Sequence, residues 1–356
     1  MHFPHAAYAF DIIGDPISCE EFGQGHINQT FKLVTTAGHA YVLQRINPYV
    51  FRKPVELMEN VCAVTEFLRS KDADPQHTLH FLPTKDGRHY FVDSDGAYWR
   101  MYAFVEGFCL DAPETEADLY QSALAFGKFQ TLLADFPAHT LHETIPEFHN
   151  TIDRYRLLRL SAEADPCGRL QSVQPEMDFL LAHEDLACTL QRMREAGQLP
   201  LRVTHNDTKL NNVLLDRHTR QHLCVLDLDT VMPGLSLYDF GDSIRYGAAT
   251  TSTEEDASIS LDLHLFEVYT RGFLSSATDL TEAEMQMMPL SAIVITIELA
   301  TRFLKDYLDG DHYFKINYPT HNLERCRGQI RLASDMIRKL QDMEYIVDQI
   351  RLSIAI

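Results

Sequence analysis

Three short apolar segments between residues 201 and 228 each adjoin a polar side chain, and this pattern constrains the chain more than any other. Asp207 follows the first segment, Asn212 directly precedes the second, and Asp227 ends the third. Short runs rich in Val and Leu predict buried β-strands. We therefore expect the oxygen atoms of these three side chains to lie at strand ends and to face one cleft.

The spacing of these residues predicts their chemistry. His205-x-Asp207-x-x-x-x-Asn212 is the spacing of the catalytic loop in protein-kinase-like phosphotransferases, and Asp227 follows twenty positions after Asp207 (227 − 207 = 20). In such a loop the Asp accepts the proton of the acceptor hydroxyl, while the Asn and the later Asp hold magnesium beside the ATP phosphates. The pattern predicts an ATP- and Mg²⁺-dependent kinase, with Asp207 as the catalytic residue in contact with substrate and Asn212 and Asp227 as metal ligands.

A second motif, Asp239-Phe240-Gly241, looks like the magnesium-binding tripeptide of kinases. No apolar strand leads into it, and it lies thirty-two positions past Asp207 (239 − 207 = 32). We expect Asp239 or Asp242 to cap a helix and to brace the catalytic loop instead. His205 is expected to hold the loop through backbone hydrogen bonds.

Composition excludes several classes of protein. The net charge of −20 argues against nonspecific binding to nucleic acid or to an anionic membrane. Seven cysteines without a C-x-x-C pair argue against a disulfide framework or a zinc site, and predict free thiols in a reducing cytoplasm. The most apolar run, 289–300, is too short to span a bilayer, and the N-terminus lacks a signal peptide. We expect a cytoplasmic monomer or homodimer.

The order of the predicted elements indicates an α+β chain with two lobes. Residues 1–100 read as a mostly antiparallel sheet with one amphipathic helix at 54–69, which begins with Pro54. Residues 101–106 read as a hinge, and residues 107–356 as a mainly helical lobe interrupted by the catalytic strands. Its predicted helices are 114–134, 151–161, 174–195, 257–275, 282–307 and 322–352.

The first lobe supplies candidate nucleotide-binding residues. Gly23 and Gly25 would let backbone amides approach phosphate closely, although the loop lacks a third glycine, and the chain has no Walker sequence. In the following strand Arg45, or in another register Gln44, is the candidate for the phosphate contact. We choose Arg45, because a guanidinium can grip two phosphate oxygens at once.

Two further predictions concern the partner of Arg45 and the adenine. Glu59 on the first helix is expected to pair with Arg45, with Glu56 as the alternative. The backbone groups of Met101 and Ala103 in the hinge are expected to bind adenine.

The chain resembles the aminoglycoside phosphotransferase and choline kinase family along nearly its whole length. Within that family the likeness is greatest to the bacterial N-acetylhexosamine 1-kinases. The residues that carry it are Gly-Gln-Gly-His-Ile-Asn-Gln-Thr-Phe (23–31), Leu-Gln-Arg-Ile-Asn (43–47), His-Asn-Asp-Thr-Lys-Leu-Asn-Asn (205–212), Leu-Asp-Leu-Asp-Thr-Val-Met-Pro-Gly (226–234), Tyr-Asp-Phe-Gly-Asp (238–242) and Thr-Arg-Phe-Leu-Lys-Asp-Tyr-Leu-Asp-Gly-Asp (301–311).

The resemblance implies a protein-kinase-like fold, ATP and Mg²⁺ as cofactors, and a small-molecule sugar as the acceptor. It directs the prediction of sugar-binding residues to His26, Arg302 and Tyr313. An Arg and an aromatic residue suit a sugar, which offers apolar faces to stack on and hydroxyls to bond. The alternatives are a kinase of choline or ethanolamine, of homoserine or of an aminoglycoside, or a pseudokinase that binds ATP without turnover.

Overall fold

The structure is a computed structural model that describes residues 4–23 and 27–354. The chain divides into two compact units. Unit 1 consists of Met1–Phe108, Asp135–Pro146 and Val213–Pro233, and unit 2 consists of Cys109–Ala134, Glu147–Asn212 and Gly234–Ile356. Unit 1 thus includes two segments, 135–146 and 213–233, that the sequence analysis placed in the helical lobe.

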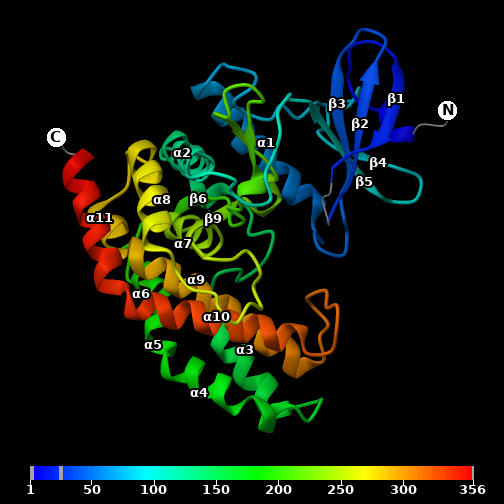
Figure 1. Cartoon of the computed structure of the whole chain (residues 1–356). Helices are drawn as coiled ribbons and strands as arrows, with labels where there is room; N and C mark the ends of the chain where they lie inside the picture. Colours follow the sequence, from blue (N-terminus) through cyan, green and yellow to red (C-terminus); the bar gives the residue numbers. More distant parts are fainter. Residues whose placement is uncertain (1–3, 24–26, 355–356) are drawn as a thin grey trace. The chain divides into compact units, whose positions relative to one another are not determined.

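Unit 1 is built on an antiparallel sheet of five strands in the order β1-β2-β3-β5-β4 (Figure 1). Two short strands, β7 and β8, form a hairpin, and Asp227 follows this hairpin in the sequence. The elements of this unit are η1 (His5–Tyr8), β1 (Pro16–Glu21), β2 (Gln29–Thr35), β3 (Ala40–Arg45), α1 (Pro54–Lys71), β4 (Phe91–Val92), β5 (Tyr98–Ala103), η2 (Ala138–Thr140), β7 (Val213–Leu215), β8 (His222–Val225) and η5 (Leu228–Thr230), followed by β9 (Met232–Gly234), which ends at the first residue of unit 2.

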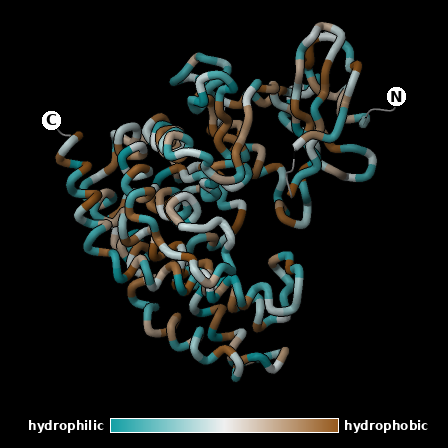
Figure 2. The backbone as a smooth tube through the Cα atoms, viewed as in Figure 1, coloured by the Kyte–Doolittle hydropathy of each residue, from teal (hydrophilic) through white to brown (hydrophobic). Residues whose placement is uncertain are grey.

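The two faces of the sheet differ in chemistry, because successive strand residues point to opposite sides. One face packs into a hydrophobic core with η1, and this core contains Ala6, Ala7, Phe10, Leu33, Tyr41, Leu43, Trp99 and Met101. The other face carries Thr30, Gln44 and Arg100. Thr30 on β2 is paired with Gln44 on β3, and Gln44 is paired with Arg100 on β5. Figure 2 shows hydrophobic and hydrophilic residues interspersed along these strands.

Helix α1 begins at Pro54, as predicted, because the fixed φ of Pro and its missing N–H suit the first helical turn. The helix buries one side within unit 1, including Leu57, Val61 and Leu68. Its buried Asn60 donates to the carbonyl oxygens of His142 (2.8 Å) and Val231 (3.0 Å). These bonds attach the two inserted segments of unit 1 to the helix.

Unit 2 is mainly helical, and the predicted α+β architecture is confirmed. Figure 1 shows α9 and α10 running side by side through it. Its elements are α2 (Glu116–Leu132), α3 (Thr151–Ala164), η3 (Leu170–Val173), α4 (Gln174–Ala182), α5 (Glu184–Ala187), α6 (Thr189–Glu195), β6 (Arg202–Thr204), η4 (Leu210–Asn212), α7 (Ser236–Gly247), α8 (Leu263–Ser276), α9 (Glu282–Asp309), α10 (His321–Arg338) and α11 (Leu340–Ile354).

Helix α9 is the central element of unit 2. A capping box of Thr281 and Glu284 starts it, and Gly310 in the left-handed conformation ends it. By length and apolar composition this helix could cross a membrane, but 78% of its most apolar stretch is buried inside the protein, as in a core helix. Helix α7 packs closely on it at Gly241, where a Cβ atom would lie 2.6 Å from the carbonyl oxygen of Ser291.

Two predicted helices are interrupted. The segment 174–195 forms three helices, because His183 and Cys188 adopt ψ angles near zero at the two junctions. The segment 322–352 divides at Lys339, whose ammonium group binds the carbonyl oxygen of Leu261 (2.6 Å) and the carboxylate of Asp335 (2.8 Å). At Lys339, a side-chain contact with Leu261 thus accompanies the break in a helical pattern that looks continuous in the sequence.

Candidate active site

The catalytic loop lies in unit 2 between β6 and η4, where the sequence predicted it. Asp207 is half-buried, and its Oδ1 atom lies 2.9 Å from Nζ of Lys209. The amide nitrogen of Asn212 donates to the backbone oxygen (2.8 Å) and to Oδ2 (3.1 Å) of Asp207. These contacts orient the carboxylate of Asp207. Because the amide nitrogen of Asn212 is used in this way, the amide oxygen is the group that remains for a metal.

Asp239 braces this loop, as predicted, but the expectation that Asp239 or Asp242 caps a helix is wrong, because both lie inside α7. Its carboxylate accepts hydrogen bonds from the backbone N–H groups of His205 (2.9 Å) and Asn206 (2.8 Å), and from the side-chain amide of Gln130 (2.7 Å). Asn206 has a φ of 65°, a conformation that is costly for most residues and needs such support. The Nδ1 atom of His205 accepts from the N–H of Asp207 (3.3 Å), so His205 also holds the loop.

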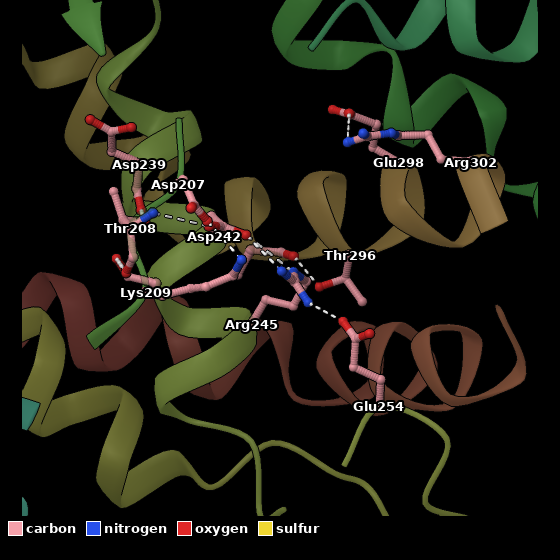
Figure 3. A network of polar contacts seen from close by, with 12 residues as sticks. Asp207, Thr208, Lys209, Asp239, Asp242, Arg245, Glu254, Thr296, Glu298 and Arg302 are labelled. Atoms are coloured by element: carbon pink, nitrogen blue, oxygen red, sulfur yellow. Dashed lines mark hydrogen bonds and ion pairs between the residues drawn. The ribbon is translucent and has the colours of Figure 1, made fainter. Parts of the chain in front are cut away.

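Asp242 from the next turn of α7 adds a second brace and an electrostatic link (Figure 3). It accepts from the N–H of Thr208 (3.2 Å) and forms an ion pair with Arg245 (2.8 Å). Burial would raise the pKa of Asp242, but Arg245 and Lys209 hold it below its usual range. Burial would likewise lower the pKa of Lys209, but Tyr246 and Asp207 raise it above its usual range. Lys209, which the sequence analysis did not single out, therefore remains a cation beside the catalytic carboxylate.

The predicted metal ligand Asp227 lies in unit 1, directly after β8. It adopts the left-handed conformation, with φ 51° and ψ 60°. A non-glycine residue in this region is uncommon, and such residues cluster at functional sites. The backbone of Asp227 is thus consistent with the functional assignment made from its position in the sequence.

A buried network next to Asp227 contains a guanidinium that the sequence analysis missed. Arg100, on the polar face of the sheet, forms an ion pair with Asp229, and both side chains are less than 5% exposed. Its Nε atom donates to Gln44 (2.9 Å), and Asn28 donates to the other oxygen of Asp229 (2.6 Å). Burial would lower the pKa of Arg100, but the carboxylates of Asp229 and Asp227 raise it. A lone Arg within the apolar strand sequence 98–103 was the available signal.

Arg45, the predicted phosphate contact, lies elsewhere. It is exposed and pairs in register with Trp99, so it belongs to the core face of the sheet and not to the face of Gln44 and Arg100. Its charge acts on Asp93, and it helps to lower the pKa of that carboxyl. Of the two registers considered, Gln44 is therefore the residue on the polar face.

Two other predicted nucleotide contacts, Glu59 and Gly23, lie within the described residues. Glu59 contacts His142 (2.7 Å) in place of the expected partner Arg45. Gly23 has a φ of 81°, which a residue with a side chain would adopt only with strain. Gly25 and His26 lie outside the described residues.

Met101 and Ala103, the hinge residues expected to bind adenine, each have a backbone group that already forms a hydrogen bond within unit 1. The carbonyl oxygen of Met101 accepts from the N–H of Leu82 (2.8 Å), and the N–H of Ala103 donates to the carbonyl oxygen of His80 (3.0 Å). Both groups are thus used within unit 1.

The structure brings Arg302 and Tyr313 together. Nη2 of Arg302 lies 3.5 Å from the hydroxyl of Tyr313, and the guanidinium also faces the rings of Phe148 and Phe314. Asp306 shapes the loop that presents Tyr313, because its carboxylate accepts from the N–H groups of three successive residues, His312, Tyr313 and Phe314.

The buried carboxylate of Glu298 lies next to Arg302. Glu298, also on α9, is 3.7 Å from Nη1 of Arg302 and 2.9 Å from Nδ1 of His149. Burial would raise the pKa of Glu298, but His149 and the guanidiniums of Arg302 and Arg154 hold it below its usual range. We refer to these four residues as the Glu298 cluster.

The candidate metal ligands fit magnesium in chemical type. Asn212 and Asp227 offer oxygen atoms, which Mg²⁺ prefers, and Mg²⁺ usually retains waters and phosphate oxygens as its other ligands. Within residues 4–23 and 27–354, no group of three or more His, Cys, Asp and Glu side chains is arranged to hold a metal. A site that is completed by nucleotide phosphates does not require such a group.

The sheet of unit 1, the His-x-Asp loop of unit 2 and the Asp that follows β8 define a protein-kinase-like phosphotransferase. Residues 18–272 match the phosphotransferase enzyme family. This match covers more than half of the chain, so the protein belongs to that family.

Solved structures of small-molecule kinases share the fold. A microcompartment-associated aminopropanol kinase is 21% identical, with a TM-score of 0.66 over 94% of this chain and 96% of that one. Amicoumacin kinase, solved with AMP-PNP and Ca²⁺, is 11% identical, with a TM-score of 0.58 over 97% and 91% of the two chains. Plasmodium vivax ethanolamine kinase is 13% identical, with a TM-score of 0.55 over 88% and 81%.

Proposed function

We propose that this phosphotransferase is an N-acetylhexosamine 1-kinase. It would transfer the γ-phosphoryl group of ATP to the anomeric hydroxyl of GlcNAc or GalNAc and give the sugar 1-phosphate and ADP. The acceptor would be a small sugar, and neither nucleic acid nor membrane would take part.

The residues of unit 2 would act on the acceptor. Asp207, oriented by Asn212, would accept the proton of the anomeric hydroxyl as that oxygen attacks the γ-phosphorus atom. Lys209 would supply positive charge to the transferring phosphoryl group. Arg302 and Tyr313 would donate hydrogen bonds to the sugar, and the ring of Tyr313 would cover one of its faces.

The residues of unit 1 would act on the nucleotide. Asp227 would be a ligand of Mg²⁺, as the sequence pattern also predicts for Asn212, and the ion when bound neutralises charge on the phosphates. Arg100 would pair with Asp229 and add a positive charge near Asp227. We propose Arg100 for the phosphate-binding role that the sequence suggested for Arg45, because Arg100 shares its network with Asp229 and is positioned by Gln44.

The observation that supports this proposal is that the Glu298 cluster contains two positively charged guanidinium groups. Arg154 and Arg302 are both cationic, and their mutual repulsion adds to burial in lowering the pKa of Arg154. The carboxylate of the cluster, Glu298, has its oxygens on His149 and Arg302. An oxygen-rich neutral acceptor suits such a surface, because hydroxyl and acetamido oxygens accept from guanidinium groups.

Acceptors of the rival kinases suit this cluster less well. Aminopropanol, ethanolamine, choline and aminoglycosides are cations, which need carboxylates or aromatic cages as partners. Homoserine could place its carboxylate on Arg302, but its ammonium group would still need an acidic partner. A pseudokinase would be expected to lack Asp207, Asn212 or Asp227, and all three are present.

The test is an acceptor panel assayed by ADP release with ATP and Mg²⁺. The panel contains GlcNAc, GalNAc, choline, ethanolamine, aminopropanol, homoserine and kanamycin. We expect the two amino sugars to be turned over fastest, and ³¹P NMR to show the product phosphate coupled to the anomeric proton. Faster turnover of a cationic acceptor would overturn the sugar assignment, and absence of ADP release with every acceptor would favour the pseudokinase.

A further inference from the structure

The imidazole of His149 is held rigidly inside unit 2. Its side chain is only 9% exposed, and Nδ1 lies 2.9 Å from Oε2 of Glu298. The ring packs against the rings of Phe148 (4.5 Å between centroids) and Tyr238 (4.7 Å). The carboxylate and the two aromatic rings therefore leave the imidazole little freedom to rotate.

Glu298 determines which nitrogen of His149 is left for another partner. An ionised carboxylate only accepts hydrogen bonds, so Nδ1 carries a proton and donates it to Glu298. The other nitrogen, Nε2, is buried and has no hydrogen-bond partner in the part of the chain that the structure describes. A buried polar atom without a partner is unfavourable, and such atoms are rare in folded proteins.

A second unsatisfied atom lies in the same cluster. Nε of Arg154 is also buried without a partner among the described residues, although another nitrogen of its guanidinium donates to the carbonyl oxygen of Phe148 (2.7 Å). Two unsatisfied nitrogens therefore occur next to Glu298, beside Arg302 and its aromatic neighbours. Unsatisfied polar groups gathered at one place suggest that a ligand supplies their partners.

The cluster is within electrostatic reach of the catalytic loop. His149 contributes to holding the pKa of Asp242 below its usual range. Asp242 in turn binds the N–H of Thr208, the residue after Asp207. The ring of His149 also packs on Tyr238, and the next residue of α7, Asp239, accepts from the N–H groups of His205 and Asn206, so the imidazole lies against the same turn of α7 that braces the catalytic loop.

We propose that His149 contacts the acceptor and determines specificity, with its Nε2 atom hydrogen-bonded to one acceptor hydroxyl and Glu298 fixing the orientation of the ring. Nε2 forms that bond, so the site selects an acceptor with a hydroxyl at one position. This assignment depends on the proposed function only for the class of acceptor, a neutral polyhydroxylated molecule.

The first experiment combines variants with deoxygenated acceptors. Steady-state kinetics are measured for the wild type, His149→Leu and His149→Gln with the best acceptor of the panel and with its monodeoxy analogues. We expect His149→Leu to lower kcat/KM for the full acceptor roughly ten- to a hundredfold, because a buried hydroxyl loses its partner, and to leave KM for ATP within about twofold. His149→Gln should recover part of the loss, since its amide can reach the position of Nε2.

The analogues separate contact from a merely structural role. One monodeoxy analogue should show nearly equal kcat/KM with the wild type and with His149→Leu, because the bond is already absent. Equal sensitivity of all analogues to the substitution would overturn the inference. His183→Gln is the matched control, since His183 is a partly buried histidine of the same unit that bonds the carbonyl oxygen of Phe179 (2.8 Å). A loss with His183→Gln as large as that with His149→Leu would also overturn it.

The second experiment needs no fully active variant. In the ¹⁵N-histidine-labelled wild type, the Nε2 resonance of His149, assigned with His149→Gln, should shift on addition of the acceptor, whereas that of His183 should not. An unshifted resonance at saturating acceptor would overturn the inference. A failure of this inference can be distinguished from a failure of the proposed function. If the panel selects a cationic acceptor, the sugar assignment fails, and the same measurements with that acceptor still decide the role of His149.

Discussion

The carboxylate of Asp239 accepts the backbone N–H of His205 at 2.9 Å, although no metal-binding strand leads into the Asp-Phe-Gly motif. This bond holds the first residue of the catalytic loop on α7. A motif that looks like a metal site in the sequence is therefore a structural support in the fold.

Replacement of this support should act on stability before it acts on chemistry. Asp239→Asn leaves one oxygen where the carboxylate now accepts three N–H groups, and it turns an amide N–H toward one of these donors. We expect a clearly lower Tm. Asp227→Ala should instead keep the Tm and abolish Mg²⁺-dependent turnover. A folded but inactive Asp239→Asn, together with an active Asp227→Ala, would reverse the two assignments.

The catalytic base gives a second prediction. Asp207→Asn should preserve the fold and ATP binding but lower kcat by roughly 10²–10⁴-fold, the usual contribution of a positioned base. Calorimetric ATP binding and steady-state kinetics would be measured on the same preparation. Retention of more than about half of the wild-type kcat would remove Asp207 from the mechanism.

The choice between two arginines is testable with charge-conserving variants. Arg100→Lys keeps a cation beside Asp229 but loses the bond from Nε to Gln44 and the planar fork of the guanidinium. We expect KM for ATP to rise roughly tenfold, while KM for the acceptor changes little. Arg45→Lys, on the other face of the sheet, is the matched control and should leave both values nearly unchanged. A larger effect at Arg45 would return the phosphate contact to that residue.

Arg302 offers a test of the acceptor site. A hydrogen bond from a charged donor contributes about 1.5–3 kcal/mol, so Arg302→Ala should lower kcat/KM for GlcNAc by roughly ten- to a hundredfold. KM for ATP should stay the same. Arg325→Ala provides a control on the neighbouring helix, because its guanidinium pairs with Glu254 and not with Glu298. A rise in KM for ATP that matches the rise for GlcNAc would indicate a general structural defect.

The buried acid Glu284 predicts how stability depends on pH. Burial would raise its pKa, but Arg202 and the N–H of Thr281 lower it below the ordinary value of 4.5. A carboxyl with a lowered folded pKa contributes stability that is complete above its unfolded pKa and is lost as the pH falls through the folded pKa. The Tm of the wild type should therefore decline on acidification below about pH 4.5.

A substitution assigns part of that decline to Glu284. Glu284→Gln leaves the buried Arg202 without its carboxylate and should cost about 3 kcal/mol at neutral pH, with a smaller decline in acid. Glu282→Gln on the same helix is the control, because its ion pair with Arg351 is exposed and should leave the Tm nearly unchanged. An acid decline equally steep in Glu284→Gln would exclude this carboxyl as a source.

Local patterns in the sequence were sufficient for the catalytic loop. The spacing of His205, Asp207 and Asn212, and the strand before Asp227, are properties of short segments whose hydrophobic pattern and turn residues determine their own conformation. The same holds for the start of α1 at Pro54 and for most helices of unit 2. The role of Asp239 could be inferred because Asp239 does not directly follow a strand, and the short β9 ends five residues before it (239 − 234 = 5).

The tertiary structure alone decided which distant side chains meet. Arg100 and Asp229 are 129 residues apart, and His149 and Glu298 are 149 residues apart, so no periodicity connects them. The choice between Gln44 and Arg45 depended on strand register, and a shift of one residue moves a side chain to the other face of a sheet. Sequence patterns describe the conformation of each segment, whereas these contacts depend on how buried segments pack, and packing brought together the ion pairs that define the candidate site.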